Sequence, residues 1–402
     1  MTTATILKND NFKTVSIGCF FKLPLTKENL SYLTLLSNYQ QLGTQEYDNQ
    51  QKLEAHADYL YAAKFETRPQ IYGDTIIVRA EGNFIEPDLV TDESYNYTAI
   101  IKFFEEMVFR PNFKNQADYQ LDLAKKQVKH DYDSFSEVAS NKAYQLFFKE
   151  YYKDYPDFQN PIFGDLALIE QLTVSDLSSY YNQLTKAPAT VIAHVKYPQK
   201  MASILENTVF EELDNSNFGQ SNLKTKLGKV GCEIEFDYDY NQAQLVYGYQ
   251  TKTDYQTPIL GLVFSQILGG DEYSLLFQEV RQKAGLVYSV FSDYYFYNNL
   301  VMIQTSLLSD SITTASEIIE AQLDKMRHNN WSEDLLQTAK QQLISHRLIL
   351  EEMPQFKVQS ELIAQLRKIE KADFEKQVNA ITKQQVVEFA QQLSQPMKVL
   401  VR

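Results

Sequence analysis

Two side chains near the middle of the second half of the chain have the types and spacing to act together on one ligand atom. Arg281 lies in the last turns of a predicted helix, and Tyr288 lies on the strand predicted to follow it. A guanidinium supplies a fixed positive charge and a phenol supplies a hydrogen bond, so the two could converge on one carbonyl oxygen. Residues of these types are more often a surface arginine and a sheet tyrosine. The pair therefore predicts carbonyl binding only if other elements position it.

The surrounding residues predict how the pair is positioned. Gly269 and Gly270 favour a tight, sterically open corner that a foreign backbone could approach. Asp271 is the predicted N-cap of the following helix, whose free N–H groups would face that corner. Gly285 is the predicted end of the helix. We expect this segment to border a binding site.

No other local pattern indicates metal or nucleophilic chemistry. The five histidines are His56, His130, His194, His328 and His346. No two of them lie within one or two helical turns, which excludes a local zinc pair. P-loop, dinucleotide-binding and nucleophile-elbow motifs are absent from the sequence, and the spacing of the many carboxylates singles out no acid–base pair.

Composition narrows the class of protein further. The 402 residues carry a formal net charge of -14, with 38 Lys and Arg scattered among 52 Asp and Glu. Nucleic acid is an unlikely partner for such a chain, and basic peptides would be favoured only weakly. Neither an export signal nor an apolar membrane-spanning run is found, and the distant Cys19 and Cys232 suit a reducing compartment. We expect a cytoplasmic protein.

The sequence repeats itself once. Leu121–Val128 recurs in pattern as Leu336–Leu343, and Leu172–Val195 recurs as Ile381–Arg402, each time as a Thr-capped helix followed by a β-branched strand. A strand glycine occurs near the start of both halves, at Gly18 and Gly248. The repeat predicts an α+β fold of two tandem duplicated units.

The predicted domains follow from this repeat. The first unit spans residues 1–213 and the second spans residues 229–402. The polar, Asn- and Ser-rich segment 214–228 between them is the predicted linker.

The segment Leu268–Ser292 resembles the C-terminal-half signature of the insulinase/pitrilysin-type zinc peptidases. In that signature a glycine-rich loop precedes L-F-x-x-[VL]-R, then a glycine and a tyrosine, as in "LGGDEYSLLFQEVRQKAGLVYSVFS". The resemblance implies duplicated α+β units, each a mainly antiparallel sheet covered by helices, arranged as half of a clamshell. It also implies that Arg281 and Tyr288 hold substrate and stabilise the tetrahedral intermediate.

The resemblance fails at the zinc motif. We align the family's H-x-x-E-H pattern with the segment "TLLSNYQQLGT". In this alignment Thr34, Ser37 and Asn38 stand where His, Glu and His are required. The downstream Glu position falls on or beside Gln127. These four residues cannot form a tight zinc site or supply an ionised base. The sequence therefore predicts a chain that holds no metal and hydrolyses no peptide alone.

Three functional hypotheses follow from the resemblance and its failure. The first is a non-catalytic, substrate-binding subunit of a heterodimeric zinc metallopeptidase, in which Gly269, Gly270, Arg281 and Tyr288 serve the site of a zinc-bearing H-x-x-E-H paralogue. The second is an inactive peptide-binding or scaffold protein without a catalytic partner, which would not need a buried guanidinium facing a cavity. The third is a rearranged site built from His56 or His130 with Asp58 or Asp133. In isolation the chain could form a homodimer.

The resemblance also implies how a peptide is held. In this family an extended peptide adds to the edge strand of a sheet through main-chain hydrogen bonds. The strands near "ADYLYAAKFETR" and "DTIIVRAEG" are the predicted candidates for that edge.

Overall fold

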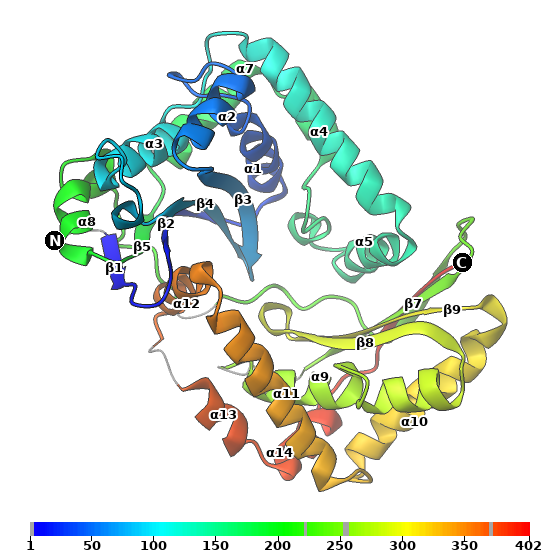
Figure 1. The fold of residues 1–402 in the computed structure, drawn as a ribbon. Helices are drawn as coiled ribbons and strands as arrows, with labels where there is room; N and C mark the ends of the chain where they lie inside the picture. The colour runs from blue at the N-terminus through cyan, green and yellow to red at the C-terminus, as the bar shows by residue number, and fades with distance from the viewer. Residues whose placement is uncertain (1–3, 221–222, 252–256, 370–372) are drawn as a thin grey trace. The chain divides into compact units, whose positions relative to one another are not determined.

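The structure is a computed structural model that describes residues 4–220, 223–251, 257–369 and 373–402. The chain forms two compact units. Unit 1 comprises the described residues of Met1–Tyr132, Pro161–Leu223 and Leu350–Glu370, and unit 2 comprises those of Asp133–Asn160, Lys224–Ile349 and Lys371–Arg402. Each unit is built around one five-stranded sheet (Figure 1).

The sheet of unit 1 has the strand order β1-β5-β2-β4-β3. β1 pairs with β5 in parallel and the other pairs are antiparallel. The strands are β1 (Ala4–Lys8), β2 (Thr14–Pro24), β3 (Lys64–Tyr72), β4 (Thr75–Ile85) and β5 (Ala189–Val195).

The sheet of unit 2 has the equivalent order β6-β10-β7-β9-β8, again with one parallel pair, β10 with β6. Its strands are β6 (Cys232–Phe236), β7 (Ala243–Gln250), β8 (Val287–Tyr295), β9 (Leu300–Leu307) and β10 (Met397–Val401). The identical strand order confirms the predicted α+β duplication, because two unrelated sheets would not share both order and direction.

Helices cover both sheets. From the first half of the chain come α1 (Lys27–Gln40), α2 (Gln50–Tyr59), α3 (Tyr97–Phe109), α4 (Ala117–Glu137), α5 (Ala139–Tyr151), α6 (Leu166–Gln171), α7 (Val174–Leu184) and α8 (Pro198–Leu205). From the second half come α9 (Ile259–Gly269), α10 (Ile312–Arg327), α11 (Glu333–Glu351), α12 (Pro354–Arg367), α13 (Phe374–Ala380) and α14 (Lys383–Gln391). Short 3-10 turns lie at Pro87–Leu89, Pro156–Phe158, Val209–Glu212, Phe296–Asn298 and Ser309–Ser311, and Phe277–Lys283 forms the π-helix η4.

The predicted helix caps are present in both repeats. Thr173 at the start of α7 and Thr382 at the start of α14 each form a complete capping box with the residue three positions later. Each box satisfies backbone N–H groups that the helix start would leave unpaired. α7 then leads into β5 and α14 into β10, as the sequence repeat predicts.

Each unit takes one helix from the other half of the chain. α5, from the first half, packs on β7, β9 and β10 of the second sheet, while α12, from the second half, packs on β5 and β2 of the first (Figure 1). The predicted boundary at residues 214–228 did not include this exchange. The exchange of helices follows from burial. Because β5 and nearly all of β7 are buried on both faces, helices must pack on each face of the sheet.

The strands of unit 2 alternate between two apolar cores. Tyr247 and Tyr249 of β7 face the core made with α9, α10, α11 and α14, whereas Val246 faces the core made with α5. Gly248 lies on the α5 side, where an added Cβ would come within 2.2 Å of the Phe147 ring. The glycine therefore lets the helix approach the strand closely. On β2 of unit 1 the ring of Phe20 covers Gly18 in a similar way.

Two further features concern the cysteines and the lengths of the helices. Cys19 is buried, Cys232 is half-buried, and neither forms a disulfide. Among the residues that the structure describes, none of the helices is both long and apolar enough to cross a bilayer.

The exchanged helix α5 gives a prediction on stability. Phe147→Ala should lower the free energy of unfolding by about 3–5 kcal/mol, because the ring is fully buried against Gly248 and its loss leaves a cavity. Phe291→Ala, at a ring that is 37% exposed, should cost about 0.5 kcal/mol or less. Urea unfolding followed by circular dichroism measures both changes, and equal losses would contradict the role of α5 in the core.

Candidate functional site

The residues at the degenerate zinc motif lie on α1 and α4 of unit 1. Thr34 and Ser37 are buried within α1, and their hydroxyl oxygens find no hydrogen-bond partner among the described residues. Asn38 donates a hydrogen bond from Nδ2 to the Thr34 carbonyl oxygen at 3.0 Å. Gln127 on α4 donates from Nε2 to Asp131 Oδ1 at 2.7 Å. Both amides are thus held by their own helices.

Asn38 and Gln127 line one cavity of about 1050 Å³ in unit 1. The structure therefore brings together two of the four positions that the family pattern assigns to zinc chemistry. Amide and hydroxyl groups do not make a tight zinc site, which needs imidazole, thiolate or carboxylate donors. Within the described ranges no three His, Cys, Asp or Glu residues are grouped to hold a metal ion. The residues present do not fit zinc.

A buried ion pair also lines this cavity. Arg79 Nε and Nη2 donate to the two carboxylate oxygens of Glu81, each at 2.8 Å, and Arg79 Nη1 donates to Gln70. Both side chains are less than a tenth exposed. Burial would make either charge costly alone, and the bidentate hydrogen bonds between the two side chains offset that cost. The sequence pattern did not single out Arg79 and Glu81, because they occupy ordinary positions in the alternating side chains of β4.

β3 is the edge strand of the first sheet, whereas β4 pairs on both sides. The predicted peptide-binding edge near "ADYLYAAKFETR" is therefore a true edge, and the prediction for "DTIIVRAEG" was wrong because β4 is interior. β3 borders the cavity through Lys64, Glu66 and Arg68. Pro69 follows them and removes one backbone donor from the strand.

The histidines form no alternative centre. His56 stacks on Tyr47 at a ring-centroid distance of 4.5 Å and also packs near Phe103. Burial lowers the pKa of His56, which keeps the imidazole neutral at neutral pH. His130 is exposed on α4. Neither residue belongs to a metal-binding group in the described part of the chain. The hypothesis of a rearranged catalytic site built from these histidines therefore gains no support.

In unit 2, the glycine pair ends α9, and Gly269 is packed against β8. A Cβ at Gly269 would lie 2.8 Å from the Ser292 backbone nitrogen, and Gly270 has right-handed helical backbone angles. The predicted open corner was therefore wrong, since the backbone that approaches Gly269 is the chain's own strand. Gly269 thus allows the close approach of α9 to β8, whereas a Cβ at the exposed Gly270 would meet only Gln266 of its own helix.

Asp271 stabilises a turn rather than the helix that follows. Its carboxylate accepts hydrogen bonds from the Tyr273 N–H and from Gln266 Nε2, both at 2.8 Å. The predicted helix cap was wrong, because the chain makes one more turn before the helix begins near Leu275. Gly285 has a left-handed φ of +63°, and the Leu286 N–H donates to the Val280 carbonyl, which ends the helix as predicted.

Arg281 lies in η4, a π-helix in which the Ala284 N–H donates to the Glu279 carbonyl five residues earlier. Leu276 and Val280 are fully buried and anchor the segment. Arg281 is exposed, with its guanidinium carbon 4.9 Å from the centroid of the Phe277 ring. The guanidinium is therefore not buried, and the sequence-based argument against a scaffold role does not hold.

Tyr288 lies at an irregularity of β8, the edge strand of the second sheet. Val287 pairs with Leu307 and Ser289 pairs with Ser306, which leaves Tyr288 as the extra residue of a β-bulge. Its side chain is 53% exposed. η4 packs against β8, so both predicted site residues lie on adjoining elements of one unit.

Comparisons with known proteins agree with this fold and with the missing zinc ligands. Residues 171–343 match the family described as "Peptidase M16 inactive domain". A "Probable inactive metalloprotease YmfF" from Bacillus subtilis is 24% identical over 353 residues, which cover 84% of this chain and 80% of that protein.

Two solved structures are similar over 99% of the chain. A conserved protein from Enterococcus faecalis V583 has a TM-score of 0.90 at 20% identity, with 96% of that chain covered. A peptidase M16 inactive domain from Pseudomonas fluorescens has a TM-score of 0.80 at 16% identity, with 94% of that chain covered. At these identities the structures support the fold alone.

The duplicated sheets and the substituted zinc motif agree with these matches. Residues 171–343 match the peptidase M16 family, and the chain is similar over most of its length to proteins described as inactive members of it.

The substituted motif predicts the behaviour of the chain toward zinc. After dialysis against zinc and then against metal-free buffer, the wild-type chain should retain far less than one zinc ion per molecule, because amides and hydroxyls bind Zn²⁺ weakly. Plasma mass spectrometry measures the retained metal. A Thr34→His, Asn38→His, Gln127→Glu variant, which restores the donor types, is the matched comparison and should retain more. One zinc ion per wild-type chain would contradict the assignment.

Proposed function

We propose that this chain is the non-catalytic, substrate-binding subunit of a heterodimeric zinc metallopeptidase. In this proposal Arg281 and Tyr288 bind a peptide and stabilise the transition state at the site of a zinc-bearing H-x-x-E-H paralogue. One observation carries it: both residues are presented to solvent by local departures from regular structure, the π-helix η4 and the β-bulge of β8.

Such departures support a functional reading. A π-helix is rare and occurs often at functional sites, and a bulge re-aims one side chain of a strand. In a regular strand successive side chains point to opposite faces of the sheet, so no single side chain can be redirected. In this chain the two irregularities fall on the two residues that the family signature singles out, within eight positions of one another.

The chemistry of the pair suits an oxygen that gains negative charge. In peptide hydrolysis, attack of water converts the scissile carbonyl into a tetrahedral oxyanion. The Arg281 guanidinium would supply charge and the Tyr288 hydroxyl would donate a hydrogen bond to that oxygen. The partner would supply the zinc ion and the general base, since Thr34, Ser37, Asn38 and Gln127 at the zinc-motif positions can supply neither.

Gly269 and Gly270 serve this proposal by positioning. The close approach of α9 to β8 at Gly269 fixes the strand that carries Tyr288. A larger residue at this position would push α9 away from the backbone of Ser292. We therefore include the two glycines as residues that hold the site and not as residues that touch the peptide.

We further propose that an extended peptide adds to the edge strand β3. This strand has one neighbour and borders the cavity of about 1050 Å³. Main-chain hydrogen bonds would give affinity, and the cavity would accept alternate side chains. Pro69 lacks an N–H and restricts the addition to the segment Lys64–Arg68.

The second candidate is an inactive peptide-binding or scaffold protein without a catalytic partner. The exposure of Arg281 favours it, because a surface guanidinium needs no catalytic explanation. The two candidates differ in one respect: a scaffold would bind peptide equally well with Arg281 replaced. The cytoplasm as the place of action remains part of the proposal, supported by two cysteines that form no disulfide.

The proposal predicts the effect of Arg281→Ala in the mixed complex. With the zinc-bearing paralogue present, the variant should lower kcat/KM for peptide cleavage by about 100-fold, because one donor to the oxyanion is lost. Tyr288→Phe should lower it by about tenfold. Cleavage of a fluorogenic peptide measures both, and analytical ultracentrifugation should show unchanged assembly.

Lys283→Ala is the matched control, since Lys283 is an exposed cation of the same π-helix that pairs with Glu279 at 2.8 Å. It should leave cleavage unchanged. Full activity of the Arg281→Ala complex, or an equal loss with Lys283→Ala, would refute the assigned roles.

A further inference from the structure

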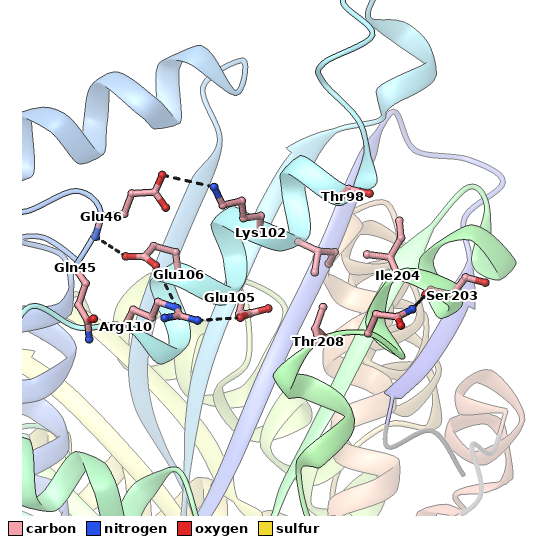
Figure 2. A pocket seen from close by; sticks show the side chains of 12 residues that line it. Gln45, Glu46, Thr98, Lys102, Glu105, Glu106, Arg110, Ser203, Ile204 and Thr208 are labelled. Atoms are coloured by element: carbon pink, nitrogen blue, oxygen red, sulfur yellow. Dashed lines mark hydrogen bonds and ion pairs between the residues drawn. The ribbon is translucent and has the colours of Figure 1, made fainter.

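A second cavity in unit 1 lies apart from the residues invoked above. It has a volume of about 640 Å³ and lies between α3 and the end of α8, closed on one side by Gln45 and Glu46 (Figure 2). Volumes of this size are typical of sites for small molecules. None of its lining residues lies on β3, η4 or β8, so the cavity is independent of the proposed peptide site.

Two isoleucines line this cavity, one from each helix. Ile101 of α3 is fully buried and Ile204 of α8 is half-buried. The hydroxyl of Thr208 is already bonded to the Leu205 carbonyl at 2.7 Å, which leaves its methyl group for packing. A ligand would therefore bury an apolar body against these side chains.

The charged groups of the cavity are unevenly balanced. Three carboxylates, Glu46, Glu105 and Glu106, face two cations, Lys102 and Arg110. Glu46 and Lys102 pair at the exposed rim, with 3.7 Å between Oε1 and Nζ (Figure 2). The remaining three groups therefore carry one excess negative charge.

The excess negative charge lies on the Glu105 carboxylate. Glu106 is buried, accepts a hydrogen bond from the Glu46 N–H at 2.7 Å and pairs with Arg110 Nε at 3.5 Å. Arg110 reaches Glu105 only at 3.7 Å, beyond hydrogen-bond distance. The Glu105 side chain is nevertheless 20% exposed and points into the cavity (Figure 2). The Glu105 carboxylate is thus partly shielded from water, and its contact with Arg110 is a long ion pair.

An anion would fit this cavity poorly. The only guanidinium on its wall, Arg110, lies between two carboxylates, so an anion bound to it would meet both of them. Like charges within a few ångströms oppose binding, and a partly desolvated site strengthens that opposition. The geometry favours a positive charge at Glu105.

We propose that this cavity binds a small organic cation, an ammonium group carried on an apolar body. The ammonium would donate to the Glu105 carboxylate, and the body would pack between Ile101 and Ile204. A charge-assisted hydrogen bond in a sheltered site supplies the specificity, and the apolar walls supply affinity.

Isothermal titration calorimetry with two matched probes tests this site. Phenylethylammonium carries the cation and the apolar ring, and 3-phenylpropionate carries the same ring with an anion. The wild-type chain should bind the ammonium with a Kd of about 1 mM or below, and should bind the carboxylate at least tenfold more weakly.

Three variants locate the binding. Glu105→Gln should weaken phenylethylammonium binding by about tenfold or more, because the carboxylate charge is lost while the shape is kept. Ile204→Trp should abolish binding by filling the cavity. Glu206→Gln, at an exposed residue beside the cavity and outside its lining, should bind like wild type. Circular dichroism checks that each variant is folded.

Absence of saturable ammonium binding would overturn the proposal. So would equal binding by Glu105→Gln and wild type, or tighter binding of 3-phenylpropionate, which would make Arg110 the anchor. None of these outcomes bears on the peptidase partnership, whose residues lie elsewhere in the chain.

Discussion

The central strands of each five-stranded sheet are buried on both faces, and the need to cover both faces governs the rest of the structure. Strands such as β5 and β7 are buried on both sides, so one set of helices per sheet is insufficient. The chain meets this need by exchange: α5 covers the second sheet and α12 covers the first. On α12, Gln365 adds polar contacts, accepting from Thr190 and donating to Thr5, each at 2.9 Å. Residues of both halves of the chain therefore contribute to each unit.

The same close packing defines the geometry of the candidate site. On the second sheet, α9 reaches the backbone of β8 because residue 269 is glycine. The chain then needs a turn, a π-helix and a bulge to return to the sheet edge, and these irregular segments present Arg281 and Tyr288 to solvent. Regular elements would have buried or hidden one of the two. Gly269, Arg281 and Tyr288 therefore lie on adjoining elements of unit 2.

The sequence predicted the duplication but not the exchange of helices between the two halves of the chain. Two Thr-capped helices and two strand glycines carry a local signal, and both capping boxes are present. The exchange of α5 and α12 depends on contacts between residues far apart in the chain, which local periodicity cannot report. Asp271 resembled a helix cap because aspartate also stabilises turns, and only the three-dimensional packing decides between the two. The pairing of Arg79 with Glu81, and the cavity at Glu105, left no pattern that distinguished them from ordinary sheet and helix residues.

The central proposal is that this chain, whose zinc-motif positions hold no metal-ligand residues, works as one member of a pair. Affinity purification of the chain from its own cells, followed by mass spectrometry and a peptidase assay with and without chelator, tests this most directly. The account predicts co-purification of an H-x-x-E-H protein of similar size, and chelator-sensitive cleavage in the mixture that the isolated chain lacks. A chain that purifies alone and inert, yet still binds peptides, would contradict it.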